Sequence, residues 1–256
     1  MMTSKRALRF GVCGAVLGTV YLGLAASAMA WTEPLWVRQF GPSGPEQSRG
    51  VATDAARNVY LTGVTRGPLG GPYRGNDDAW VAKYNAAGRA LWKRQLGTAE
   101  NDAASGVATD AAGTVYLTGA TLGSLGGHYQ GNFDAWMAKY NAAGHALWKR
   151  QFGTKTVEAS LRVATDAAGN VYLSGMTSGS LGGANNGLFD AWVAKYDAAG
   201  RKLWTRQLGT ESYDFANGVA TDAAGNLYLA GETDGSLGGA NHGGFDAWLA
   251  KYSTQP

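Results

Sequence analysis

The sequence predicts an all-β fold: a closed four-bladed β-propeller with four antiparallel strands in each blade. Three observations lead to this prediction. The chain repeats itself every 56 residues, each repeat contains four short β runs, and the chain starts with a spare run of the fourth type. The spare N-terminal strand would complete the last blade and close the ring.

The repeat is defined by aromatic residues and glycines that recur with a step of 56 residues. Four copies follow one another, with no insertion between these anchor positions. Periods of about 40 to 50 residues are typical of propeller blades. The anchors are Trp36, Trp92, Trp148 and Trp204; Trp80, Trp136, Trp192 and Trp248; Tyr60, Tyr116, Tyr172 and Tyr228; and Gly63, Gly119, Gly175 and Gly231.

Each copy contains four runs rich in Val, Leu, Tyr, Trp and Thr, which in the second copy span 106–110, 114–119, 135–140 and 146–152. Two joints are tight turns that begin with Asp or Asn and end with Gly, the pattern of a type I turn. Arg57 stands where the other copies have this Gly, and a left-handed backbone there would cost about 1 kcal/mol. The long joints, 97–105 and 121–134 in this copy, are expected on the opposite face.

The two ends of the repeat region predict how the ring closes. Residues 35–40 have the sequence of a fourth run, and residues 247–252 have the sequence of a third run. Pairing them would complete the fourth blade and hide two strand edges. The tryptophans are expected to fill the wide gaps between blades that diverge by roughly 90° in a ring of four.

Residues 1–30 read as a secretory signal peptide, followed by a single propeller domain at 31–256. Lys5, Arg6 and Arg9 precede an apolar stretch, and Ala28-Met29-Ala30 has the small-x-small pattern of a cleavage site. An uncleaved N-terminal anchor is the alternative. The expected location is secreted, periplasmic or on the cell surface.

The charge balance and the cysteine content exclude some classes of partner. Residues 1–30 contain three bases and no acid, so residues 31–256 carry 19 basic and 19 acidic side chains. A neutral surface gives no reason to expect nucleic acid or an anionic membrane as a partner. Cys13 is the only cysteine, so no disulfide stabilises the domain. A monomer is expected, and two chains sharing a larger ring remain an alternative.

Recurring strings resemble the bacterial SBBP-type β-propeller repeat. They are Gly-Val-Ala-Thr-Asp-Ala-Ala-Gly-Asn-Val-Tyr-Leu-x-Gly, Gly-Ser-Leu-Gly-Gly, Phe-Asp-Ala-Trp-Val-Ala-Lys-Tyr and Leu-Trp-x-Arg-Gln-x-Gly-Thr, and they cover nearly all of 35–252. The resemblance implies an exported or cell-surface protein. It implies no shared activity and transfers no catalytic residue.

The sequence favours a binding or scaffold module that recognises a protein or a glycan, without a cofactor and without enzymatic activity. Aromatic, amide and charged residues that differ between copies gather on the long-loop face, as in recognition surfaces. The candidate ligand-binding residues are Tyr73, His128, Tyr129, Arg162, Asn185, Tyr213, Phe215, Asn241 and His242. A structural envelope or matrix protein without a specific ligand is the alternative.

Two further kinds of site were weighed against simpler interpretations. The repeated Asp78, Asp134, Asp190 and Asp246 are expected to accept backbone hydrogen bonds, with a calcium site as the weaker alternative because few other oxygen ligands lie nearby. A hydrolase or lyase would require Asp102, Glu158 and Asp214 to converge in one pocket. The repeated lysines and arginines are expected to join neighbouring blades by pairing with aspartates or loop carbonyls.

Overall fold

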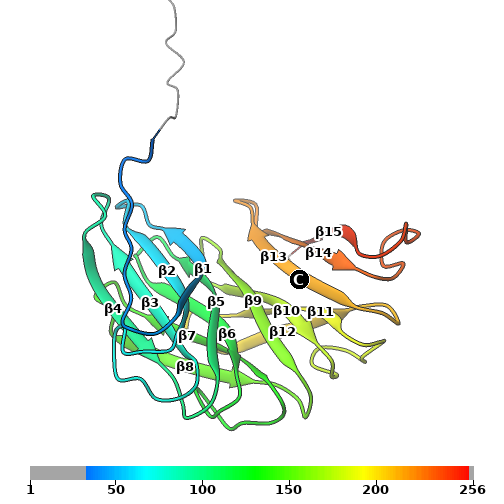
Figure 1. The fold of residues 1–256 in the computed structure, drawn as a ribbon. Coiled ribbons are helices and arrows are strands. Elements are labelled where there is room, and N and C mark those ends of the chain that lie inside the picture. Colours follow the sequence, from blue (N-terminus) through cyan, green and yellow to red (C-terminus); the bar gives the residue numbers. More distant parts are fainter. Residues whose placement is uncertain (1–32, 254–256) are drawn as a thin grey trace, which may run out of the picture. The chain divides into compact units, whose positions relative to one another are not determined.

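The computed structural model describes residues 33–253, and these residues form four antiparallel sheets and no helix. The predicted signal peptide at 1–30 lies outside the described residues. The chain divides into two units, Met1–Leu35 and Trp36–Pro256, and every strand belongs to the second. Figure 1 shows the strands of each sheet following one another in sequence order.

The first three sheets have four strands each, in the orders β1-β2-β3-β4, β5-β6-β7-β8 and β9-β10-β11-β12, and the fourth has three, β13-β14-β15. The first strands of the sheets are β1 (Glu46–Thr53), β5 (Asp102–Thr109), β9 (Glu158–Thr165) and β13 (Asp214–Thr221). The second strands are β2 (Val59–Thr65), β6 (Val115–Thr121), β10 (Val171–Thr177) and β14 (Asn226–Thr233). The third strands are β3 (Asp78–Tyr84), β7 (Asp134–Tyr140), β11 (Asp190–Tyr196) and β15 (Asp246–Ser253). The fourth strands are β4 (Ala90–Leu96), β8 (Ala146–Phe152) and β12 (Lys202–Leu208).

The short turns have the predicted chemistry. The Gly113 amide donates to the Asp110 carbonyl over 3.0 Å, and Gly113 has φ +73°. The carboxylate of Asp110 accepts the amides of Ala112 and Thr114, which fixes the turn from its first residue. Arg57 adopts φ 61°, so its backbone is left-handed at the position where the other copies have Gly.

The first strand of each sheet starts earlier than predicted. Residues 102–105, expected in a long joint, belong to β5, and residues 102–104 pair with β6. A β-bulge between Ala104 and Gly106 shifts the register. Because the bulge interrupts the alternation of side chains between the two faces of the sheet, the sequence pattern did not indicate a strand before Gly106. Opposite the bulge, a Cβ on Gly119 would lie 1.8 Å from the Ala103 carbonyl oxygen, so this anchor position requires glycine.

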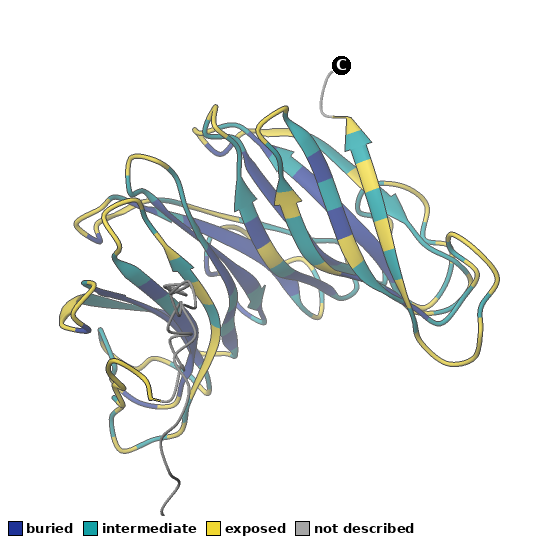
Figure 2. Ribbon diagram, turned by 90° about the horizontal axis from the view of Figure 1, so that it is seen from above, coloured by how far each residue is buried: buried dark blue, intermediate teal, exposed yellow. Residues whose placement is uncertain are grey.

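The main hydrophobic cores lie between successive sheets. In the first, Val81 of β3, Val107 of β5 and Trp136 of β7 pack together with side chains from both sheets. Trp80, Trp136 and Trp192 are each at most 1% exposed, which confirms their predicted role as packing residues. Figure 2 shows the buried positions concentrated on the middle strands of the sheets.

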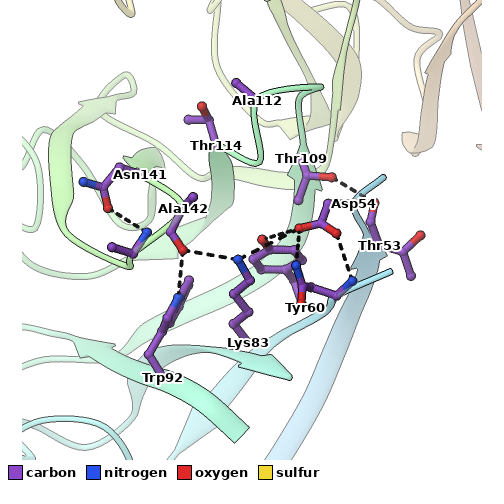
Figure 3. Close-up of polar contacts among 12 residues, drawn as sticks. Thr53, Asp54, Tyr60, Lys83, Trp92, Thr109, Ala112, Thr114, Asn141 and Ala142 are labelled. Carbon is purple, nitrogen blue, oxygen red and sulfur yellow. Dashed lines mark hydrogen bonds and ion pairs between the residues drawn. The ribbon is translucent and has the colours of Figure 1, made fainter. Parts of the chain in front are cut away.

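Hydrogen bonds and charged groups join one sheet to the next (Figure 3). Lys83 of β3 donates to the carbonyl of Ala142, in the β7–β8 turn of the next sheet, over 3.2 Å, and its Nζ lies 3.9 Å from Asp54. The indole of Trp92 donates to the same carbonyl over 3.1 Å. Thr109 donates to Thr53 between the inner strands over 2.9 Å. Lys83, Lys139 and Arg94 therefore connect neighbouring sheets through turn carbonyls, as predicted. Arg150 and Arg206 instead donate to the carbonyls of the residues that precede them.

The predicted closure of the ring by the N-terminal strand is wrong in this structure. Residues 36–40 form no strand, and within residues 33–253 β15 pairs only with β14. The N-terminal segment instead packs against the first sheet: Trp36 donates to the Ala86 carbonyl over 3.1 Å, and Phe40 contacts Trp80. Inner strands touch in the order β1, β5, β9, β13, and no extensive contact among the described residues links β13 back to β1. The sheets therefore do not bring the segment and β15 together.

Candidate functional site

Four aromatic rings form a partly exposed cluster where the third and fourth sheets meet. Phe189 stacks on Tyr213 with ring centroids 5.9 Å apart, and Phe215 stacks on Phe245 at the same distance. Phe215 also lies 6.0 Å from Phe189 and 6.1 Å from Tyr213. Tyr213 is 37% exposed and Phe245 is 51% exposed, so the cluster presents rings to solvent. We call these four residues the aromatic cluster.

The strand ends at the long-loop side position the aromatic cluster. Phe189 precedes β11 and Tyr213 precedes β13, and the two residues form a parallel β-bridge between the sheets. The Asp214 amide donates to the Phe189 carbonyl over 2.7 Å, which holds the two segments side by side. Phe245 immediately precedes β15, and Phe215 is the second residue of β13. Neighbouring sheets thus contribute to one apolar surface, as in recognition sites with aromatic anchors.

Two members of the aromatic cluster were predicted, and two were missed. Tyr213 and Phe215 stand out because the equivalent residues in the third copy are Val157 and Ala159. Phe189 and Phe245 carry no such signal, since the repeat places Phe133 at the same position. Their involvement appears only when the third and fourth sheets pack together.

A cavity of about 420 Å³ adjoins the aromatic cluster. Its wall is formed by Phe245, Asn217 and Glu232, together with Gly218 of β13 and Ala230 of β14. The site therefore combines exposed rings with one amide and one carboxylate, which can orient a ligand by hydrogen bonds.

The tyrosines predicted as ligand-binding residues in the first two sheets form hydrogen bonds within their own loops. Tyr73 donates its hydroxyl to the Asn76 carbonyl, and Tyr129 donates to the Asn132 carbonyl, each over 2.5 Å. Burial raises the pKa of Tyr129, and the charges of Asp134 and Glu100 add to the shift. His128 is exposed next to Tyr129. These residues lie in loops of other sheets, apart from the aromatic cluster.

The predicted asparagines and His242 hold the long loops of the third and fourth sheets. Asn185 accepts the Gly187 amide over 2.9 Å, and Asn241 accepts the Gly243 amide over 2.8 Å. The Nδ2 atom of Asn185 is buried and lacks a hydrogen-bond acceptor. His242 is 84% exposed, and its ring lies 3.3 Å from Asp246. The aromatic cluster, by contrast, lies at the strand ends.

Arg162 lies on the inner strand β9, away from the long loops. It is exposed, pairs with Ser174 of β10, and donates to the Leu161 carbonyl over 2.8 Å. A Cβ on Gly106 would lie 3.1 Å from the Cα of Arg162, so the two inner strands run close together here.

The repeated aspartates accept hydrogen bonds from their long loops. Asp78 accepts the Arg74 amide over 3.0 Å and the Gln95 side chain over 2.7 Å. Asp134, Asp190 and Asp246 accept the equivalent loop amides, from Gln130, Asn186 and His242. No group of three or more His, Cys, Asp or Glu side chains within residues 33–253 is arranged to hold a metal ion.

The acids that an enzyme would have to bring together are each enclosed within their own sheet. Asp102, Glu158 and Asp214 begin the first strands of three different sheets and are fully buried. Asp102 accepts the Thr98 amide and the Thr121 hydroxyl, each over 2.5 Å. Burial raises the pKa of Asp102, and the nearby charge of Asp78 adds to the shift. A carboxylate without solvent access cannot meet a substrate in a shared pocket.

Comparison with known proteins agrees with the repeat architecture. A family model described as a beta-propeller repeat, SBBP, matches residues 35–70 and 203–238. The chain therefore carries SBBP β-propeller repeats, as the recurring strings predicted.

Two curated relatives are similar over part of their length. The regulatory protein FlaEY of Caulobacter vibrioides is 29% identical over 166 residues, which covers 57% of this chain and 17% of the relative. An uncharacterised WD repeat-containing protein of Acanthamoeba polyphaga mimivirus is 22% identical over 231 residues, covering 68% of this chain and 16% of the relative. The chain thus spans about a sixth of the length of these relatives.

Among solved structures, the PQQ domain of pyranose dehydrogenase from Coprinopsis cinerea is similar, with 15% identity and a TM-score of 0.41. The match covers 81% of this chain and 53% of that chain. No helix in the described part of the chain has the length and hydrophobicity that a membrane span requires.

Proposed function

We propose that this chain is an exported binding or scaffold module that recognises a protein or a glycan through its long-loop side. The aromatic cluster is the observation that carries the proposal, because four rings in mutual contact remain partly open to solvent. Aromatic anchors contribute strongly to binding at low cost in conformational entropy.

Binding is tested by a glycan array and by affinity capture from the medium or envelope of the producing cells. Tyr213→Ala and Phe245→Ala should weaken capture of any ligand by at least tenfold, since each removes an exposed ring. Tyr73→Ala is the matched control, because Tyr73 is 39% exposed but lies on another sheet. Equal losses in all three variants, with an unchanged melting temperature, would contradict the placement of the site.

A structural role without a specific ligand is the second hypothesis. It predicts that neither the array nor the capture experiment yields a ligand, and that the aromatic substitutions leave every interaction unchanged. Export belongs to the same proposal, with the protein secreted, periplasmic or on the cell surface. N-terminal sequencing of the exported protein should begin at Trp31, and an intact N-terminus would contradict cleavage by signal peptidase.

A further inference from the structure

Each successive pair of sheets is joined by an apolar interface. The first sheet and the fourth sheet each expose one half of such an interface. Between the first two sheets, Val81 is 0% exposed and Val107 is 8% exposed, and both belong to one core. The residue of the fourth sheet equivalent to Val81 is Leu249, which is 76% exposed. The residue of the first sheet equivalent to Val107 is Val51, which is 67% exposed. Each sheet thus presents the apolar face that the other would cover.

The fourth sheet also leaves open the place that an outer strand fills elsewhere. In the third sheet, Gln207 of β12 accepts the amides of Leu181 and Gly182 and donates to Asp190 over 2.9 Å. Gln95 makes the same three contacts in the first sheet. In the fourth sheet a cavity of about 400 Å³ lies between the long loop and β15, lined by Leu237, Gly238 and Asp246. No atom of the described part of the chain would come within 4 Å of a Cβ on Gly238.

The N-terminal segment Trp36–Phe40 has the residues that fit this cavity. Its Gln39 stands at the repeat position of Gln95, is exposed, and makes no side-chain hydrogen bond within the described residues. The segment contacts the first sheet in the same way as β4 contacts the second sheet. Arg38 donates to the Gly88 carbonyl over 3.0 Å, as Arg94 donates to Gly144 over 2.7 Å. The segment therefore has the sequence and the contacts of a fourth strand, but it is not paired with a sheet within the described residues.

We propose that a second copy of this chain supplies the missing partner on each side. Residues 36–40 of each copy would pair with β15 of the other, and the two chains would close one ring of eight sheets. Gln39 would donate to Asp246 of the partner subunit, and Leu249 would be covered by the partner's Val51. Thr53 would continue the ladder in which Thr109, Thr165 and Thr221 each donate to the threonine carbonyl of the preceding inner strand.

A second copy fits these observations better than closure within one chain. Among residues 33–253, the first and fourth sheets of one chain make no extensive contact through their inner strands. Two copies related by a twofold axis use the same two surfaces reciprocally, which is the usual symmetry of homodimers. The exchange also removes the open edge of β15, which would otherwise invite uncontrolled strand pairing. This proposal replaces the monomer expected from the sequence.

Sedimentation equilibrium of the purified protein tests the proposal. We expect a single species with twice the mass of one chain. Leu249→Lys should raise the dimer dissociation constant by at least about 100-fold, because it would bury an unpaired charge in the new interface. Leu147→Lys is the matched control, since Leu147 of β8 is 53% exposed and lies outside both proposed surfaces. Neither substitution should lower the melting temperature of the separated chains.

Other outcomes would overturn the proposal. A monomer at all concentrations whose stability falls with Leu249→Lys would indicate closure of four sheets within one chain. Assemblies larger than two chains would indicate head-to-tail growth.

Cross-linking then tests the register. Val81 pairs with Arg94 in the first sheet, so Leu249 should face Arg38 of the partner subunit. The double variant Arg38→Cys/Leu249→Cys should form disulfide-linked dimers under oxidation, and either single variant should not. A disulfide within one chain would contradict exchange between copies. Ligand capture through Tyr213 is measured separately, so its failure would leave this result unaffected.

Discussion

The ammonium group of Lys83 lies 3.2 Å from the carbonyl oxygen of Ala142, which is 59 residues further along the chain. The same ammonium sits 5.1 Å from the centre of the Tyr60 ring and 3.9 Å from the Asp54 carboxylate. Lys139 repeats the relationship with Ala198 over 2.8 Å and with Tyr116 at 5.1 Å. The third strand of one sheet is thereby joined to the turn of the next sheet, which is how a row of separate sheets becomes one unit.

Replacing Lys83 should weaken this junction. Lys83→Ala removes the donor to Ala142 and leaves Asp54 without its cation, so we expect a loss of about 1–3 kcal/mol in the free energy of unfolding. Urea denaturation measures the change. Lys149→Ala on β8 is the control, because that side chain is exposed. Equal stability of both variants would show that the junction contributes nothing.

The glycine opposite each bulge should tolerate no side chain. Gly119→Ala would place a Cβ 1.8 Å from the Ala103 carbonyl oxygen, and relief of this overlap should cost about 2 kcal/mol or more. Gly183→Ala is the matched control in a long loop, where the nearest atom would be 3.5 Å away. Thermal unfolding of the two variants would contradict the argument if their melting temperatures agreed.

Arg57 is the one turn residue whose replacement should stabilise the protein. Its φ of 61° is unfavourable for a residue with a Cβ, so Arg57→Gly should raise the free energy of unfolding by up to about 1 kcal/mol. The reverse change, Gly113→Arg in the equivalent turn at φ +73°, should lower it by a similar amount. Changes of the same sign in the two variants would rule out backbone strain as the cause.

Stability should fall in acid because of the turn aspartates. Burial opposes ionisation of Asp54 and Asp166, but hydrogen bonds from the side chains and amides of Asn58 and Asn170 outweigh it, so both pKa values are lowered. A carboxyl with a lowered folded pKa stabilises the fold above its unfolded pKa of about 3.9 and loses this contribution as the pH falls through the folded value. The pKa of Asp102 is raised, so ionisation of this carboxyl destabilises the fold, and its contribution to stability becomes more favourable as the pH falls.

Urea midpoints compared at pH 6 and pH 3 test the pH dependence. The midpoint should be lower at pH 3, and the difference should shrink in Asp54→Asn, which cannot titrate at this position. An unchanged difference in that variant would exclude Asp54 as a contributor. Asp234→Asn replaces a loop aspartate outside the short turns and serves as the control.

Much of the candidate site was beyond the reach of the sequence. Tyr213 and Phe215 were found because they depart from the repeat, but Phe189 and Phe245 conform to it. Tyr73 and Tyr129 differ from Asn185 and Asn241 at the same repeat position, yet the two tyrosine hydroxyls donate to the carbonyls of their own loops. Comparison of the copies identifies residues that differ from the repeat. Only the packing between sheets shows which of these residues are in contact.

By itself, the sequence determined the local structure and its periodicity: the four strands of the first three copies, the Asp-to-Gly turns, and the buried tryptophans at Trp80, Trp136 and Trp192. These features follow from residue type and spacing within about 56 residues, where propensity and turn chemistry act. The tertiary structure decided the bulge at Ala104, the aromatic cluster, and the contact of Phe40 with Trp80 in place of pairing with β15. The aromatic cluster and the contact of Phe40 depend on packing between separate segments, which leaves no periodic signal in the chain. The bulge depends on how β5 pairs with β6.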